Sequence, residues 1–154
     1  MDDSSVGEHR LRTFHIQGYT VTGFYAVYHV VGVVLAMAGT GLLVDCFARF
    51  ALEGRGTPAP VAPTETLVAS GSYQYVRNPI YTAVLLIITG QALFFGSRAL
   101  VAYAGVLWLA FHAFVIAYEE PTLRRRYGAS YHVYSAHVGR WRPRITPWHG
   151  SEAA

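Results

Sequence analysis

The chain has 154 residues, enough for one domain, and its composition is 53% hydrophobic and 14% charged. Such an apolar composition excludes a disordered chain. The formal net charge is +3, and every basic residue is an arginine. A basic balance can indicate a nucleic-acid partner, but here the arginines border apolar segments, where anionic lipid headgroups are the nearer partners. We therefore expect membrane lipids as partners and no nucleic acid.

Three apolar stretches are each about as long as the ~20 residues that cross a bilayer as a helix. They are Gly23 to Val44, Ile80 to Gly96 and Ala99 to Tyr118, and none contains Lys or Arg. The polar segment before the first stretch lacks the features of a signal peptide, so that stretch is expected to remain in the mature protein. The sequence predicts an all-α integral membrane helical bundle with about three transmembrane helices. We expect a single domain, 1–154, with 1–18 as a polar N-terminal tail.

The arginines fall unevenly on the two sides of three such helices. Arg10, Arg12 and Arg98 lie on one side, and the others lie on the side of segments 48–78 and 119–154. The positive-inside rule places the second side in the cytoplasm and the N-terminus outside. We therefore expect 48–78 to be a cytoplasmic loop and 119–154 a cytoplasmic C-terminal segment.

Small residues and turn residues predict how the helices connect. Gly23, Gly32, Gly39 and Gly41 lie in the first stretch, where small residues let membrane helices approach closely. His29 in the same stretch is expected to bond a neighbouring helix. Glu53 to Pro63 is a Gly- and Pro-rich loop, either a lid or pocket wall or a plain connector. The turn at Gly96, Ser97 and Arg98 is short enough to predict an antiparallel helical hairpin.

A helix N-terminus is predicted at Asn78 and Pro79. Asparagine is a favoured N-cap residue, and proline suits the first helical position because an N–H there has no helical partner. Free backbone N–H groups and the positive end of the dipole would then lie beside Arg77 and attract a carboxylate or phosphate. We expect a small anionic group of a cofactor at this point. The alternative is that Arg77 meets lipid phosphates and that Tyr73, Tyr75 and Tyr81 form an interfacial aromatic belt.

Two adjacent carboxylates, Glu119 and Glu120, stand where the third apolar stretch ends, before Pro121. Ionisable groups at that depth are costly and are candidates for function. Consecutive residues of a helix point about 100° apart, so at most one of the pair faces squarely into the bundle. His112 lies two turns before Glu119 on the same face, which favours Glu119 for the interior and Glu120 for an arginine partner. The alternative is that both carboxylates are solvated at the membrane edge.

The segment from Leu123 to His137 predicts an amphipathic interfacial helix, because Leu123, Tyr127, Tyr131 and Tyr134 recur at helical spacing. His132 and His137 are five residues apart, with no carboxylate or thiol beside them, so no metal site is predicted. The segment from Val138 to Trp148 is expected to be extended and to fold back over the cytoplasmic mouth of the bundle.

These motifs resemble, in order and spacing, those of the isoprenylcysteine carboxyl methyltransferase and phospholipid methyltransferase family. They are Gly71-x-Tyr73-x-Tyr75-Val76-Arg77-Asn78-Pro79-x-Tyr81, an apolar hairpin, Glu119-Glu120-Pro121-x-Leu123, Tyr127-Gly128-x-x-Tyr131-x-x-Tyr134 and Arg140-Trp141-x-Pro143. The stretch from Gly54 to Pro60 looks like the bacterial members of the family, so we expect a protein of the bacterial inner membrane.

The resemblance implies an integral membrane enzyme that uses S-adenosylmethionine, bound between the last hairpin and the C-terminal segment. It implies Glu119, Glu120 and Arg140 as catalytic residues. The cofactor-binding residues that it implies are Tyr73, Tyr75, Val76, Arg77, Asn78, Pro79, Tyr81, Glu119, Leu123, Tyr127 and Tyr131. The physical interpretation agrees in part: the helix start with Arg77 suits the methionine carboxylate, and Glu119 or Glu120 suits the ammonium and sulfonium charges.

Two features depart from the family pattern. The family often has histidine at the position of Asn78, and asparagine cannot act as a base near neutral pH. Members also commonly have four or more transmembrane helices, so a second copy of this chain could complete the acceptor tunnel as a homo-oligomer.

The acceptor is expected to be a lipophilic small molecule or a lipidated one that enters from the bilayer. An isoprenyl-cysteine carboxylate or a lipid thiol needs no base, and Arg140 could orient a carboxylate by a bidentate contact. A phospholipid amine would lose a proton to Glu119 or Glu120. Two rival functions stay open: an NAD(P)H-dependent membrane reductase of the sterol and steroid reductase type, whose C-terminal region is similar, and a non-catalytic membrane adaptor.

Overall fold

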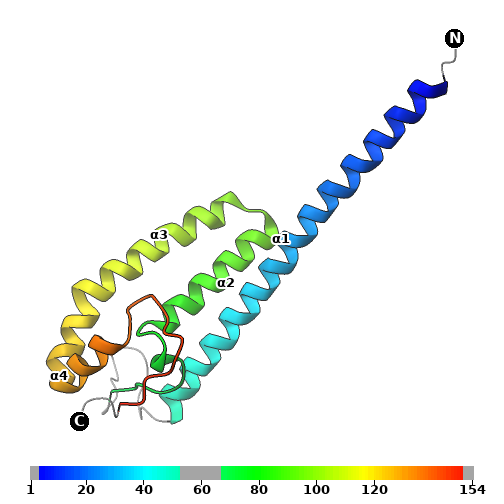
Figure 1. Ribbon diagram of the computed structural model, residues 1–154. Coiled ribbons are helices and arrows are strands. Elements are labelled where there is room, and N and C mark those ends of the chain that lie inside the picture. The colour runs from blue at the N-terminus through cyan, green and yellow to red at the C-terminus, as the bar shows by residue number, and fades with distance from the viewer. Residues whose placement is uncertain (1–3, 53–66, 151–154) are drawn as a thin grey trace.

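The computed structural model describes residues 4–52 and 67–150, with side chains from Ala26 onward except that of Phe50. Four helices account for most of these residues, and the described ranges contain no strand. The helices are α1 (Ser4–Leu52), α2 (Pro79–Phe95), α3 (Arg98–Phe114) and α4 (Glu120–His137), with a 3-10 turn η1 (Gly71–Gln74) and a π-helical turn η2 (Val115–Glu119). Figure 1 shows α2 lying between α1 and α3. The all-α expectation is confirmed.

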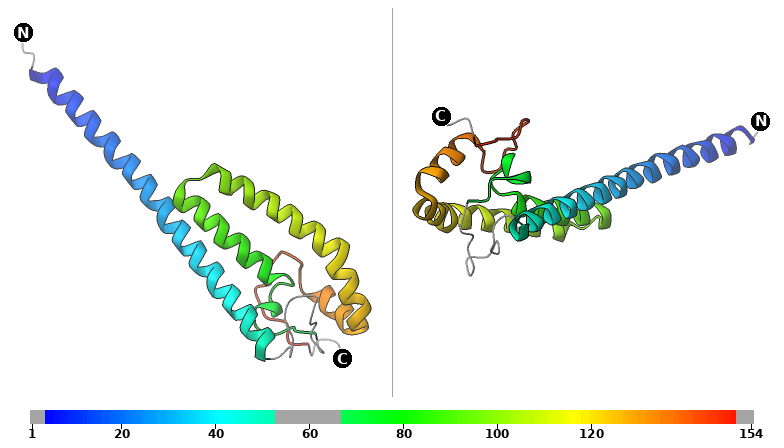
Figure 2. Two further views of the ribbon diagram at one scale, coloured as in Figure 1. Left: turned by 180° about the vertical axis from the view of Figure 1, so that it is seen from behind. Right: turned by 90° about the horizontal axis from the view of Figure 1, so that it is seen from below.

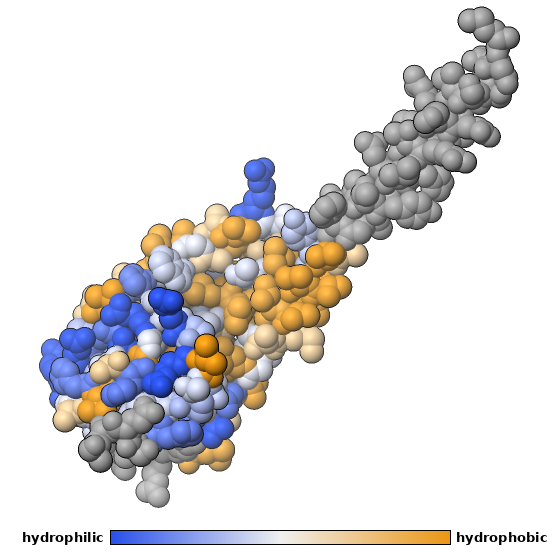
Figure 3. All heavy atoms as spheres, in the orientation of Figure 1, coloured by the Kyte–Doolittle hydropathy of each residue, from blue (hydrophilic) through white to orange (hydrophobic). Residues whose placement is uncertain are grey.

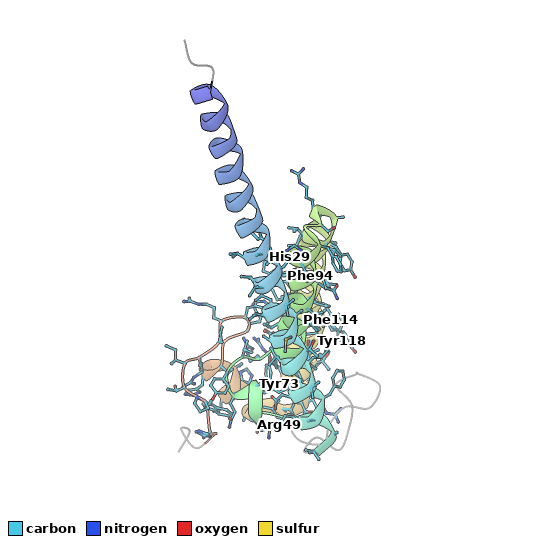
Figure 4. All side chains as sticks on the ribbon, turned by 90° about the vertical axis from the view of Figure 1, so that its right-hand side faces the viewer. His29, Arg49, Tyr73, Phe94, Phe114 and Tyr118 are labelled. Atoms are coloured by element: carbon cyan, nitrogen blue, oxygen red, sulfur yellow. The ribbon has the colours of Figure 1, made fainter. Side chains whose placement is uncertain are left out.

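Glycines allow α1 and α2 to pack with their backbones in contact. A Cβ atom added at Gly32 would lie 2.7 Å from the carbonyl oxygen of Gly90, and one added at Gly39 would lie 2.7 Å from that of Ala83. Close backbone approach of this kind is typical of helix pairs in membranes. The same helix pair brings His29 against Phe94, whose rings meet edge to face at 5.0 Å (Figure 4). The predicted use of these glycines in packing is confirmed for Gly32 and Gly39.

The predicted hairpin joins α2 to α3. Gly96 ends α2 in the left-handed conformation with φ of 60°, which favours glycine, and the Ser97 side chain accepts a hydrogen bond from the backbone N–H of Leu100 to cap α3. The helices long and apolar enough to cross a bilayer are the segment Ala26–Arg49 of α1 and the segment that begins at Arg98, while α2 has 17 residues. A helix of that length spans about 26 Å, close to the ~30 Å of a hydrocarbon core.

The helix formed by the third apolar stretch does not stop at the glutamate pair. It continues through η2 into α4, with Pro121 in the first turn of α4, where proline is tolerated. Inside α4, Gly128 adopts φ of 50° and ψ of −121°, which are not helical and turn the chain. Figure 2 shows α1, α2 and α3 forming one layer, with α4 and the C-terminal segment to one side of it.

The C-terminal segment after α4, residues 138–150, is irregular and folds back over the loop that precedes α2, as expected. Three main-chain hydrogen bonds join the two segments: Arg77 N–H to Gly139 O at 2.9 Å, Arg144 N–H to Tyr75 O at 2.9 Å, and Trp148 N–H to Gln74 O at 3.2 Å. We call residues 138–150 the tail. Its Val138 and Trp148 pack with Tyr131 and Tyr134 of α4 in a small core.

A second core joins the end of α1 to η1. Cys46, Val68 and Tyr73 are buried together, and the Asp45 carboxylate accepts hydrogen bonds from the backbone N–H and the hydroxyl of Ser72. Arg49 and Tyr73 mark this end of the molecule in Figure 4. The residues of the expected polar tail 1–18 that the structure describes are helical and form the start of α1. The expected loop from Glu53 to Pro63 lies outside the described residues.

Candidate active site

Glu120 is the centre of an ion-pair cluster at the junction of α2, α4 and the tail. It is 5% exposed, and Arg140 binds it with both ends of its guanidinium group, Nε to Oε1 at 2.6 Å and Nη2 to Oε2 at 3.0 Å. Arg77 Nη1 lies 3.3 Å from Oε1, and Arg124 Nη2 lies 3.6 Å from Oε2. The start of α2 and the acidic end of the third apolar segment therefore converge.

The charges of this cluster keep Glu120 ionised. Burial alone would raise its pKa, but the hydrogen bond from Arg140 and the charges of Arg77, Arg140 and Arg124 outweigh burial and hold the pKa below the usual range. Three guanidinium groups share one carboxylate, so the cluster keeps an excess of positive charge. Arg77 also donates from Nη1 to the Tyr131 hydroxyl at 3.0 Å, while its buried Nε has no hydrogen-bond partner.

Glu119 has a different environment. Its Oε2 accepts a hydrogen bond from the Tyr81 hydroxyl at 2.9 Å, and no arginine of the described chain forms an ion pair with it. The Tyr81 ring lies 4.6 Å from that of Phe111 and 6.4 Å from that of Trp141, measured between centroids. Aromatic faces and a carboxylate without a cation together favour a positively charged ligand group.

Trp141 connects the tail to α3 beside this carboxylate. Its indole Nε1 donates to His112 Nδ1 at 3.0 Å, and the His112 ring stacks on Trp108 at 5.3 Å. A neutral His112 that accepts a hydrogen bond at Nδ1 carries its proton on Nε2. The Nε2–H group is then a hydrogen-bond donor. The π-helical turn η2 lies between His112 and Glu120. Such turns are rare in proteins as a whole, and those that occur are often at functional sites.

The start of α2 lies where the sequence predicts, but Asn78 does not cap it with its side chain. The Asn78 amide donates instead to the carbonyl oxygen of Arg140 at 3.2 Å, and only the Asn78 carbonyl bonds the helix, accepting from Thr82. The tail competes for the amide because it passes directly over this helix start. Asn78 therefore positions Arg140, and the first-turn N–H groups of α2 have no partner within the helix.

The predicted site residues fall into two groups. Seven of them come together around the start of α2, whose first position is the buried Pro79: Arg77, Asn78, Tyr81, Glu119, Glu120, Tyr131 and Arg140. The remaining predicted residues have other surroundings as well. Tyr73 is buried beside Cys46, Val76 is buried, Tyr75 is 38% exposed, and Leu123 and Tyr127 pack against the Tyr131 and Trp148 core. The assignment of both groups to the cofactor or to catalysis stays a prediction.

Sequence reasoning missed three contributors to this region. Trp141 and Phe111 border Tyr81, and Arg124 shares Glu120. Trp141 was visible only as part of the Arg140-Trp141-x-Pro143 motif, and Arg124 only as one of three consecutive arginines. No group of three metal-ligating side chains occurs in the part of the chain that the structure describes.

The fold and the cluster define a helical membrane protein with a charged site at one end of its apolar helices. The phospholipid methyltransferase family matches residues 27–130, more than half of the chain, and the chain belongs to this family of membrane methyltransferases. No curated protein and no solved structure matches the chain. The expected resemblance is thus confirmed, and the matched range includes α2, the glutamate pair and most of α4.

Proposed function

We propose that the protein transfers a methyl group from S-adenosylmethionine to an amine on a lipophilic acceptor. The observation that carries the proposal is the pairing of two opposite environments on adjacent residues: Glu119 without a cationic partner, and Glu120 surrounded by three arginines. The amino-acid end of S-adenosylmethionine has one anionic and two cationic groups, so it needs both environments.

The residues present fit this cofactor. The buried Nε of Arg77 is a donor without a partner inside a cluster with excess positive charge, which suits the methionine carboxylate. Glu119, with the rings of Tyr81 and Trp141 beside it, suits the ammonium or sulfonium group. When bound, the cofactor supplies an electrophilic methyl group on a sulfonium.

The geometry favours an amine over a carboxylate as the acceptor. The Nε and Nη2 groups of Arg140 both donate to Glu120, so this edge of the guanidinium group already makes a bidentate contact inside the protein and is not open to an acceptor carboxylate. A carboxylate beside Glu119 would also meet a like charge, while a protonated amine would meet an opposite one. An isoprenyl-cysteine acid is therefore a poor match for this site, and a lipid with an amine headgroup is a good one.

The residues then divide their roles. Glu119 holds the positive charge and accepts a proton from the acceptor nitrogen at Oε2, because Glu120 is committed to its arginines. Tyr81 orients Glu119 through its hydroxyl. Arg140 and Asn78 are positioning residues that fix the tail over the site. Fixing both reactants in one geometry is the main requirement, and it can lower a barrier by up to about 7–11 kcal/mol.

The test is incubation of purified protein with methyl-labelled S-adenosylmethionine and a panel of lipid amines, lipid thiols and isoprenyl-cysteine acids. We expect label in the amine lipids only. Glu119→Gln removes the charge and should weaken equilibrium binding of the cofactor by about 10- to 100-fold, the equivalent of the ~1.5–3 kcal/mol of a hydrogen bond to a charged group. Tyr81→Phe should reduce turnover, and its matched control Tyr103→Phe, on an exposed position of α3, should not.

The outcomes separate the rival functions. Saturable binding of NADPH in place of S-adenosylmethionine would support the reductase. A protein that binds neither and is indifferent to Glu119→Gln would be a non-catalytic adaptor. Label in the acids alone would contradict the assignment of an amine acceptor.

A further inference from the structure

The tail presents one fully exposed apolar side chain directly after two arginines. Ile145 is 99% exposed, the highest value among the large hydrophobic residues of the described chain. Arg142 and Arg144 lie within three residues of it, and neither has a carboxylate partner in the described residues. The methyl-transfer site uses none of these three side chains.

The backbone around Ile145 is held in place. The backbone N–H of Arg144 donates to Tyr75 O and its Nη1 donates to His137 O, both at 2.9 Å. Three residues after Ile145, Trp148 is buried and donates to Gln74 O. A side chain between two fixed points cannot be withdrawn into the core without breaking these bonds, so its exposure is built into the fold.

The depth of the tail follows from Trp141. Its hydrogen bond to His112 places it beside the apolar part of α3 and η2, where Leu109 and Phe114 of α3 and Ile116 of η2 are exposed. Ile145 is four residues further along, at most about 14 Å of chain away. The tail therefore runs at the level where the apolar surface of the helices gives way to the hydrophilic end seen in Figure 3.

We propose that the segment Arg142 to Ile145 is a bilayer anchor for a surface that contains anionic lipids, with Ile145 in the acyl region and Arg142 and Arg144 at the phosphates. Apolar insertion combined with arginines is the pattern of interfacial segments, and long basic side chains place their charge at headgroup depth. Anionic lipids are the partner because they attract two cations that have no carboxylate partner within residues 26–52 and 67–150.

In the test, Ile145→Cys is combined with Cys46→Ala, so that a polarity-sensitive dye attaches only at position 145. The labelled full chain is then reconstituted in vesicles. The vesicles are phosphatidylcholine alone or phosphatidylcholine mixed with phosphatidylglycerol, each with a lipid-borne or a water-soluble quencher. We expect the lipid-borne quencher to reduce the dye fluorescence and aqueous iodide to leave it unchanged. The reduction by the lipid-borne quencher should be larger in the vesicles that contain phosphatidylglycerol. Arg142→Gln should reduce the difference between the two compositions, and the matched change Arg98→Gln, at the opposite end of the hairpin, should not.

Quenching by iodide with no effect of lipid quenchers would overturn the proposal. So would equal lipid quenching in both compositions, or protection from both quenchers, which is the result that burial under a second copy of the chain gives. None of these readouts depends on methyl transfer, so this proposal and the proposed function fail separately.

Discussion

Glu119 and Glu120 are neighbours in the sequence, yet they bond different partners. Glu120 is 5% exposed and shared by three arginines, while Glu119 bonds one neutral tyrosine. Removing one member of a buried ion pair leaves its partner charge uncompensated. The free-energy cost of this change is larger than the net stabilisation that the intact pair provides. The two carboxylates should therefore differ in which property they control: Glu120 the stability of the fold, and Glu119 the binding of the ligand.

Glu120→Gln is expected to lower the free energy of unfolding by about 2–3 kcal/mol, below the usual 3–5 for a buried pair because Arg140 and Arg124 are partly solvated. Thermal unfolding in detergent measures it. Glu119→Gln is the matched control and should lose less than about 1 kcal/mol, because glutamine can still accept from Tyr81. Equal losses in the two variants would contradict the division of roles.

The pH dependence of stability provides a second measurement on Glu120. Its pKa is lower in the folded than in the unfolded protein, so its contribution is present above the ordinary value of 4.5 and is lost as the pH falls through the folded pKa. The midpoint temperature of unfolding should therefore decrease as the pH is lowered below about 4.5. In Glu120→Gln this part of the drop should be missing.

Among the elements, α1 and α2 form the closest contact. A Cβ atom at Gly90 would lie 2.5 Å from the carbonyl oxygen of Gly32, and backbone atoms cannot move aside as a side chain can. Gly90→Ala is expected to destabilise the chain by about 1–3 kcal/mol through overpacking. Gly105→Ala on α3 meets nothing within 4 Å and should be neutral or slightly stabilising. Unfolding by a denaturing detergent compares the two, and a neutral Gly90→Ala would disprove the contact.

The tail is joined to α3 by one side-chain hydrogen bond, from Trp141 to His112. Trp141→Phe keeps an aromatic ring beside Tyr81 but removes the donor, so we expect faster hydrogen exchange in residues 138–148 and weaker cofactor binding. Trp108→Phe is the control, because Trp108 stacks on His112 but holds no part of the tail. Unchanged exchange in Trp141→Phe would mean that the main-chain bonds and the contacts of Arg140 hold the tail without Trp141.

For the whole molecule, the uneven arginines predict that α4 and the tail face the cytoplasm and the turn at Gly96 to Arg98 faces the opposite side. Single cysteines at Arg98→Cys and Arg125→Cys in a Cys46→Ala background test this in intact cells with a membrane-impermeant maleimide. We expect labelling at position 98 only. The reverse pattern would invert the topology and place the site outside.

The sequence predicted the elements well because length, glycine and proline act locally. The apolar stretches, the Asn78-Pro79 helix start and the Gly96 turn all needed only neighbouring residues. The arginine partner expected for Glu120 is present. Which arginine it would be, and the partners of Asn78 and His112, were not predictable, because each bond crosses from one segment to another distant in sequence. The expected role of Arg140 in orienting an acceptor stays a prediction, and the bond of its Nε and Nη2 to Glu120 adds a second role inside the protein.

The three main-chain hydrogen bonds between the tail and the loop before α2 also bear on how this family can diversify. Backbone donors and acceptors are the same in every residue except proline, which lacks the N–H. Side chains at Tyr75 and Arg144 can therefore change without loss of these bonds. A scaffold held in this way keeps its architecture while its side chains vary, which makes the tail the natural starting point for redirecting the proposed activity to new acceptors.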